Sequence, residues 1–274
     1  MNIHQPDYFT LADQTLPNGR RVWVIQTSTG DTPADAAHPY GGNNLGLHVG
    51  DSPTTVHHNR ARLLAQLNAQ AGVTRISWLN QIHGADVVQV TATLPHLPNA
   101  DAQFTAMPHT ALAIMTADCV PIVLVNANGS QIGAIHAGWQ GLAKGVIGNT
   151  VQAMTQTQAD SDTSQWQAWL GACIAAKQYE VDSRVRDALA VTLKQSGQPS
   201  DQIDAYLRPN PQKAGHYFAD LAQIARAQLV ACGIAQVASR GLDSFGDTRF
   251  YSYRRQTQQG LTATGRMATL IAIA

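Results

Sequence analysis

The chain has 274 residues, of which 44% are hydrophobic and 13% charged, and its formal net charge at pH 7 is zero. This length suits one or two domains, and because no linker or charge block divides the chain we expect a single domain over residues 1–274. The lack of a basic excess argues against a nucleic-acid partner and against a membrane-surface protein.

The N-terminal stretch MNIHQPDYFTLADQTLPNGR has no basic segment followed by an apolar core, so it does not resemble a signal peptide. No apolar run reaches the ~18 residues that span a bilayer, and we expect a cytoplasmic protein. The cysteines Cys119, Cys173 and Cys232 are odd in number and far apart, which argues against a disulfide framework.

The first third of the chain predicts strands and one long helix. Residues 20–27 are β-branched and aromatic and predict a strand, while residues 28–44 are rich in Gly, Pro, Asp and Asn and predict a long loop. Residues 45–51 predict a further strand. Between residues 54 and 71 apolar side chains recur at helical spacing, and Gly72 provides a stop signal.

The middle of the chain is dominated by apolar strand patterns. The predicted strands cover residues 75–79, 86–92, 111–119, 121–126 and 131–139. Asn128-Gly129 lies between the last two and is a strong signal for a β-hairpin.

The last part of the chain mixes both patterns. Helices are predicted at 141–156, 180–195 and 217–232, and strands at 166–172, 249–255 and 267–274. Because strands and helices do not alternate regularly, a mixed α/β fold of α+β character fits better than a doubly wound parallel sheet.

Three short segments each place a metal-ligand residue type at the end of a predicted strand. They are NQIHGAD around His83, TADCVP around Cys119 and AIHAGWQG around His136. Zinc binds His nitrogen and Cys sulfur, and a catalytic zinc usually has three protein ligands with a fourth position left for water. The separations of 36 and 17 residues match no local zinc motif, so buried or turn residues are the alternative interpretation.

Several segments together resemble one family. NQIHGADVV, ADAQFT, TADCVPIVL, AIHAGWQGLAKGVI, LGACIAAKQYEV and FYSYRR…TGRM occur in the order seen in the bacterial YfiH-like family, also called the laccase-domain or multicopper polyphenol oxidase family and reassigned as purine nucleoside phosphorylases. The resemblance runs from NNLGLHVGD at residues 43–51 to the C-terminus.

The resemblance implies both a fold and an activity. The fold is a compact sandwich of mixed β-sheets with flanking helices, and His83, Cys119 and His136 are the implied zinc ligands. The implied reactions are phosphorolysis of adenosine, inosine, guanosine and methylthioadenosine, and hydrolytic deamination of adenosine. Purine nucleosides and phosphate are therefore the expected partners.

Deamination requires a zinc-bound hydroxide that attacks C6 of adenine and a neighbouring group that moves protons. Asp118 and Asp86 are candidates for this proton transfer, or for orienting a metal ligand, because each lies close in sequence to one of the ligands. Trp139 is a candidate for stacking on the purine, with a core position as the alternative.

Phosphorolysis requires a phosphate site, for which planar guanidinium groups are well suited. Arg254, Arg255 and Arg266 are the candidates, and an edge strand with solvated arginines is the alternative. Asn44 and His48 are further candidates for substrate contacts, with a structural turn as the alternative.

Three positions depart from the family pattern. Gln140 stands where Arg or Lys usually follows HAGW, so a cation is missing there, and Lys144 is a candidate substitute. Leu242 stands where the family commonly has Cys, which argues against an additional metal site. Ala172 replaces the usual Pro before Cys173.

The leading hypothesis is a zinc-dependent purine nucleoside phosphorylase with adenosine deaminase activity. A copper-dependent polyphenol oxidase is one alternative, although ten histidines without an H-x-H pair are a poor supply of copper ligands. A cysteine hydrolase with Cys119 as nucleophile and His136 as base, and a non-catalytic metal-binding or partner-binding protein, are the others.

Overall fold

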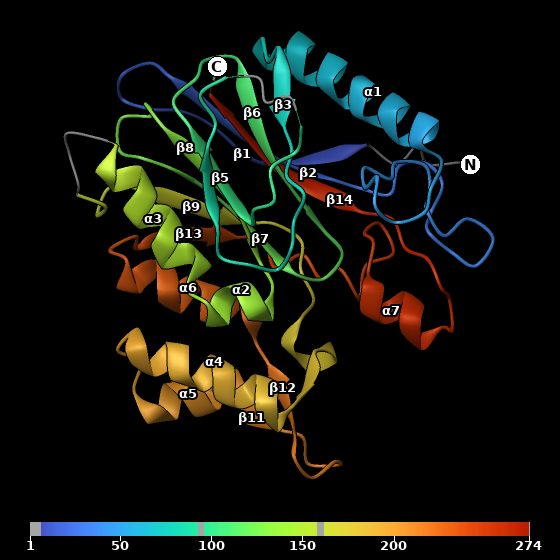
Figure 1. Cartoon of the computed structure of the whole chain (residues 1–274), viewed down its shortest axis with the longest axis vertical. Coiled ribbons are helices and arrows are strands. Elements are labelled where there is room, and N and C mark those ends of the chain that lie inside the picture. Colours follow the sequence, from blue (N-terminus) through green and yellow to red (C-terminus); the bar gives the residue numbers. More distant parts are fainter. Residues whose placement is uncertain (1–6, 93–95, 158–161, 274) are drawn as a thin grey trace.

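Two β-sheets pack face to face at the centre of the molecule, and helices cover their outer faces (Figure 1). The computed structural model describes residues 7–92, 96–157 and 162–273. Within them it contains three sheets and seven α-helices, which confirms the predicted mixed α/β fold. None of the helices in these ranges is long and apolar enough to cross a membrane.

The five-stranded sheet joins the two ends of the chain. Its order is β1-β2-β14-β6-β3, and all neighbours are antiparallel except β3 and β6. The strands are Tyr8–Thr15 (β1), Arg21–Thr27 (β2), Met267–Ile273 (β14), Thr110–Thr116 (β6) and Arg75–Ser77 (β3). Strands were predicted for four of these segments, and residue 274 of the last prediction lies outside the described residues.

The six-stranded sheet has the order β13-β9-β7-β8-β5-β4. Its strands are Gln236–Ser239 (β13), Gln167–Leu170 (β9), Val120–Val125 (β7), Ile132–Ala137 (β8), Ala102–Thr105 (β5) and Val87–Gln89 (β4). Strands β7 and β8 pair antiparallel, and Gly129 between them has a φ of 64°, so the predicted hairpin is confirmed. A third, three-stranded sheet contains Glu180–Asp182 (β10), His216–Ala219 (β12) and Leu207–Pro209 (β11).

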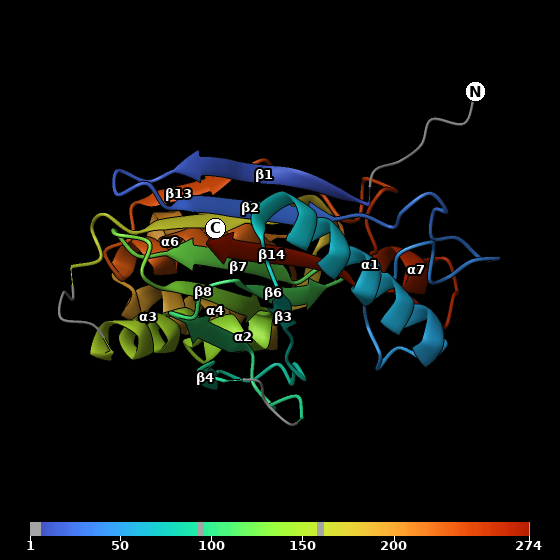
Figure 2. The same cartoon turned by 90° about the horizontal axis from the view of Figure 1, so that it is seen from above.

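Successive side chains of a strand point to opposite faces of its sheet, and in both large sheets the two faces are apolar. Ile114 and Ile271 of the five-stranded sheet pack against Val123 and Trp169 of the six-stranded sheet, forming the core between them. The opposite face of the five-stranded sheet is covered by α1, Pro53–Ala71, which matches the predicted helix (Figure 2).

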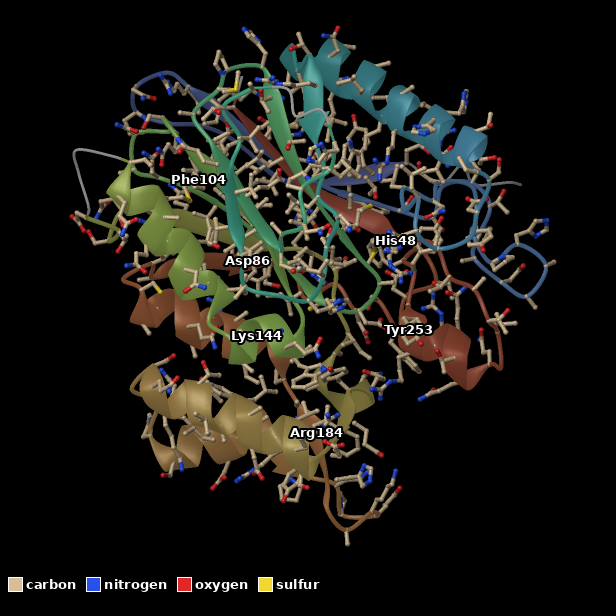
Figure 3. The ribbon with its side chains drawn as sticks, in the orientation of Figure 1. His48, Asp86, Phe104, Lys144, Arg184 and Tyr253 are labelled. Carbon is tan, nitrogen blue, oxygen red and sulfur yellow. The ribbon has the colours of Figure 1, made fainter. Side chains whose placement is uncertain are left out.

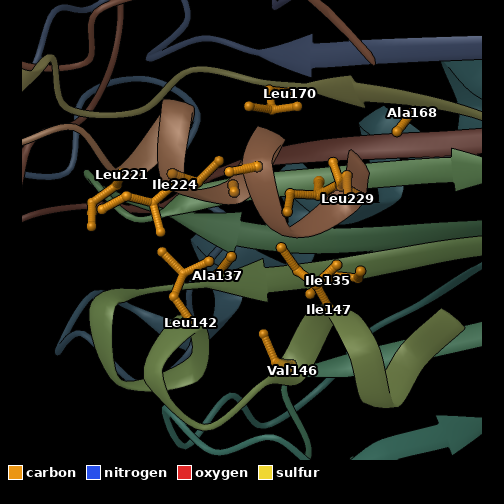
Figure 4. Packing of buried hydrophobic residues seen from close by; sticks show 14 of the residues in the cluster. Ile135, Ala137, Leu142, Val146, Ile147, Ala168, Leu170, Leu221, Ile224 and Leu229 are labelled. Atoms are coloured by element: carbon orange, nitrogen blue, oxygen red, sulfur yellow. The ribbon is translucent and has the colours of Figure 1, made fainter. Parts of the chain in front are cut away.

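Five further helices of the described residues lie on the six-stranded sheet and beside the small sheet. They are Trp139–Ala143 (α2), Val146–Gln156 (α3), Ser183–Gln195 (α4), Ser200–Tyr206 (α5) and Leu221–Ala231 (α6). Leu142, Ile147 and Leu229 of these helices pack with Ile135 and Leu170 of the sheet (Figure 4). The helix predicted at 141–156 is broken at Gly145, whose φ of 79° is left-handed.

Two strand predictions are wrong, and both failures have a visible cause. Residues 45–51 form no strand, and side chains of α1 bind the carbonyls where the segment begins: Asn59 binds that of Asn44 and Arg60 that of Leu45. Residues 249–255 also form no strand, since the Ser252 hydroxyl accepts a hydrogen bond from the amide of Arg255 and caps α7, Tyr253–Gln258. The long loop predicted at 28–44 is confirmed.

Candidate metal centre

The three predicted ligands come together at one end of the six-stranded sheet. Cys119 directly precedes β7, and His136 lies on the adjacent strand β8 opposite Pro121. His83 arrives on the turn between β3 and β4 with a φ of 56°. Their ligand atoms all lie within 4.8 Å of one another, and the two histidine rings meet edge to face with centroids 4.8 Å apart.

Asp101 links two of these ligands. Its Oδ1 lies 2.7 Å from Nδ1 of His136, and this fully buried carboxylate also accepts hydrogen bonds from the amides of Ile82, His83 and Gly84. Burial raises the pKa of Asp101, but the hydrogen bonds from His136 and these amides outweigh it and hold the pKa below its usual range. One carboxylate therefore orients the His136 ring and fixes the turn that carries His83.

The charges of Cys119 and His136 stabilise each other. Burial raises the pKa of a thiol, but the neighbouring His136 and His83 rings outweigh burial and lower the pKa of Cys119 to about 6. Burial likewise lowers the pKa of His136, whereas the Cys119 thiolate and Asp101 raise it to about 9. Both shifts favour a thiolate on Cys119 beside an imidazolium on His136.

The cluster fits a tetrahedral metal ion. Zinc bonds of ~2.0–2.3 Å place the ligand atoms of a tetrahedral site roughly 3.4–3.8 Å apart. The ligand atoms of the three residues lie within 4.8 Å of one another, so small side-chain shifts would bring them to that separation. His136 uses Nδ1 for Asp101, which leaves Nε2 for an ion, the arrangement typical of metal-bound histidine. Across the described ranges, this is the one group of three or more His, Cys, Asp or Glu side chains close enough to hold a metal.

A cavity of about 450 Å³ opens over the cluster, within the size range of small-molecule sites. Besides the three ligands, its walls include His48, Trp139, Tyr179, Tyr253, Arg254 and Arg266. Figure 3 shows His48 and Tyr253 on the same side of the molecule, coming from the loop before α1 and from α7. Aromatic faces and cations thus surround the cluster.

Two arginines, Arg266 and Arg254, line the cavity, and both are half-buried. Burial lowers the pKa of Arg266, and its Nη1 donates to the carbonyls of Thr264 and Gly265 rather than to a carboxylate. Arg254 donates to the carbonyls of Gln178 and Glu180 and lies 5.3 Å from the Tyr179 ring centroid. Neither guanidinium forms an ion pair with a described carboxylate.

Two other predicted substrate residues hold the fold of the site rather than line the cavity. The Arg255 guanidinium donates to backbone carbonyls between Ser244 and Phe250, away from the cavity. Asn44 is buried, and its Oδ1 accepts hydrogen bonds from the amides of Gly46 and Arg266 at 2.9 and 2.8 Å.

The predicted acid/base residues occupy different surroundings. Asp118 lines the cavity, but its two oxygens accept hydrogen bonds at 2.7 Å from the Ser244 hydroxyl and the Arg254 amide. Asp118 also has a left-handed φ of 103°. Asp86 is exposed and is not among the residues lining the cavity, and Figure 3 shows it apart from His48 and Tyr253. Their catalytic roles stay predictions.

The structure also shows where the residues that depart from the family pattern lie. Gln140 lines the cavity, but Lys144 does not, since its Nζ donates to the carbonyl of His83 at 3.0 Å. Lys144 thus braces the His83 turn. Leu242 and Cys173 line a separate cavity of about 220 Å³, where burial raises the pKa of Cys173 to about 12.

Asp101 is a residue of the metal centre that the sequence analysis does not predict, and Thr116 and Tyr179 of the cavity wall are two others. Asp101 lies in the ADAQFT segment, which was noted for its resemblance to the family but not for a ligand-orienting carboxylate. The sequence does offer one signal, since the acidic Asp101 directly precedes the fully buried strand β5. A buried carboxylate is stable only when several hydrogen-bond donors surround it, so such a position indicates a structural or functional role.

Comparison with known proteins identifies the family. Residues 26–274 match the family model described as multi-copper polyphenol oxidoreductase laccase. The chain is 38% identical over 261 residues to a protein named purine nucleoside phosphorylase from Pseudomonas aeruginosa, covering 94% of this chain and 96% of the relative. For the purine nucleoside phosphorylase YfiH of Escherichia coli K12, identity is 37% over 235 residues, covering 85% and 87% of the two chains.

A solved structure is similar to this chain in both fold and sequence. The crystal structure of a Neisseria meningitidis protein matches with a TM-score of 0.81 and 31% identity, over 98% of this chain and 99% of that one. The chain therefore belongs to the multi-copper polyphenol oxidoreductase laccase family, the YfiH-like family, whose relatives include proteins named purine nucleoside phosphorylase.

Proposed function

We propose that the protein is a zinc-dependent purine nucleoside phosphorylase that also deaminates adenosine. The observation that carries the proposal is the convergence of His83, Cys119 and His136 on the floor of a cavity that also contains two arginines. The names of the relatives that match nearly the whole chain support the same activity. Adenosine, inosine, guanosine and methylthioadenosine are the proposed substrates.

His83, Cys119 and His136 would hold the zinc ion, and Asp101 would orient the His136 ring. When bound, zinc supplies a Lewis acid at the reacting end of the cavity. Tyr179 and Tyr253 offer aromatic faces on which a purine can stack. Asp118 stays our candidate for moving protons, because its carboxylate is the one among the described residues that lines the cavity.

Phosphorolysis also requires an anion site, and we assign it to Arg266 with Arg254. Both guanidinium groups line the cavity without a carboxylate partner, so each retains its charge for a phosphate oxygen. Arg255 does not share this role, because it does not line the cavity and its guanidinium binds backbone carbonyls between Ser244 and Phe250. The anion site therefore depends on one arginine from α7 and one from the residue before β14.

Product analysis of the purified, zinc-loaded protein tests the proposal. Incubated with adenosine alone, the protein should form inosine. With phosphate added, free base and ribose 1-phosphate should appear. Oxidation of catechol-type substrates without added copper, in the absence of either nucleoside product, would refute the proposal in favour of a polyphenol oxidase.

A second candidate function is supported by the Cys119–His136–Asp101 arrangement. These residues stand in the order nucleophile, base and orienting carboxylate, as in cysteine hydrolases. The same sulfur and ring nitrogen cannot serve easily as zinc ligands at the same time. Hydrolysis that persists after removal of metal and stops after alkylation of Cys119 would favour this alternative.

A further inference from the structure

We infer that Thr116 is a substrate-binding residue whose hydroxyl forms a hydrogen bond with the nucleoside. This inference rests on the proposed function, because it concerns the same cavity. Thr116 is the last residue of β6, three residues before Cys119, and it lines the cavity. It is not one of the metal ligands, acids or arginines considered above.

The hydroxyl of Thr116 has no hydrogen-bond partner among the described residues. Thr116 is only 2% exposed, and its Oγ1 is one of the buried side-chain nitrogen and oxygen atoms of the described residues that lack a partner. Among those atoms, it is the one that belongs to a residue lining the cavity. A buried hydroxyl is normally hydrogen-bonded, so an unpaired one beside a cavity indicates that a ligand completes it.

Two other polar side chains of the cavity, those of Gln81 and Asp118, already form hydrogen bonds within the protein. The Gln81 amide donates to the carbonyl of Met115 and accepts from its amide, at 2.7 and 2.8 Å. Asp118 accepts from the Ser244 hydroxyl and the Arg254 amide. Thr116 is held on a strand yet keeps both a donor and an acceptor for a ligand.

The direction of the side chain indicates which ligand it meets. Leu112 and Ile114, at alternate positions on β6, face the six-stranded sheet, so Thr116 faces the same side, where Cys119 and His136 lie. Arg266 shares alternation with Ala268 and Leu270, which face α1. The Thr116 side chain therefore lies on the same face of the sheet as the metal cluster, whereas Arg266 approaches from the other face.

Calorimetric titration with inosine, without phosphate, tests the inference on the zinc-loaded protein. Inosine is used because it is already deaminated and cannot be phosphorolysed without phosphate. Thr116→Val keeps the shape of the side chain and removes the hydroxyl, so we expect about ten-fold weaker binding of inosine. Thr116→Ser should bind within about three-fold of the wild type.

Two further readouts exclude a structural role. Because the hydroxyl makes no hydrogen bond with any described residue, Thr116→Val should not lower the melting temperature or the zinc content. The KM for phosphate should also stay unchanged. Equal inosine affinity of Thr116→Val and the wild type, or a lower melting temperature of that variant, would overturn the inference alone. Failure of the wild type to bind inosine would overturn the proposed function, and this inference with it.

Discussion

Replacement of Asp101 by Asn removes the carboxylate that organises the candidate metal centre. The four hydrogen bonds to Asp101 divide evenly between its oxygens, with His83 and His136 on Oδ1 and Ile82 and Gly84 on Oδ2. Asn keeps only one acceptor oxygen, so in either amide orientation two donors face an NH₂ group. The variant is nearly isosteric, and the effect isolates hydrogen bonding and charge.

The expected loss of stability follows from those two donors. Each orphaned buried donor costs ~1–3 kcal/mol, and because the turn around Ile82 is partly exposed we take the low end, about 2 kcal/mol in total. For a chain of this size that lowers the melting temperature by roughly 4–8 °C. Loss of the carboxylate behind His136 should also weaken zinc binding by roughly 10–100-fold.

Differential scanning fluorimetry and competition with a chromophoric zinc chelator measure the two effects. Asp187→Asn is the matched control, because Asp187 is 66% exposed on α4 and remote from the cluster. It should change neither the melting temperature by more than about 1 °C nor the zinc affinity. If Asp101→Asn binds zinc as tightly as the wild type and melts at the same temperature, the role assigned to Asp101 is wrong.

Two other predictions concern Arg266 and the cysteines. A Cβ at Gly46 would lie 2.8 Å from Cγ of Arg266, so Gly46→Ala should displace that side chain and raise the KM for phosphate roughly ten-fold or more while zinc content is unchanged. In metal-free protein, iodoacetamide should label Cys119 faster as the pH rises through about 6, because the thiolate reacts. Cys173 should stay unlabelled, since its pKa is about 12 and it is buried.

Controls and contrary outcomes are available for both. Gly148→Ala places a methyl group where no atom lies within 4 Å, so it should leave the KM for phosphate unchanged. An unchanged KM in Gly46→Ala would count against Arg266 as the anion site. Mass spectrometry locates the labelled cysteine, and a Cys119 rate that rises only near an ordinary thiol pKa of ~8.5 would contradict the thiolate–imidazolium pair.

The features predicted correctly from the sequence are those determined by local signals. Asn128-Gly129 supplies the left-handed conformation that a tight hairpin needs, and the helical spacing before Gly72 produces α1. The strand predicted at 45–51 failed because the decisive partners are distant. Arg60 binds the carbonyl of Leu45 through two nitrogens, at 2.9 and 2.7 Å, so this carbonyl is taken up by a side chain 15 residues away instead of a neighbouring strand.

The site was predictable in its residue types but not in its contacts. The metal ligands were identified by resemblance, whereas Asp101 lies 35 residues before His136 and otherwise binds only amides, which no spacing rule reveals. Arg254 and Arg255 look equivalent in the sequence. Because successive residues on a helix point about 100° apart, Arg254 of α7 lines the cavity and Arg255 does not.

The central claim is that nucleoside cleavage depends on a metal held by His83, Cys119 and His136. The most direct test is titration of zinc into metal-stripped protein while phosphorolysis of adenosine is followed. We expect no activity without zinc and a rise that saturates at about one equivalent per chain, as one three-ligand cluster requires. Full activity in the stripped protein, or no phosphorolysis at any zinc concentration, would contradict the claim.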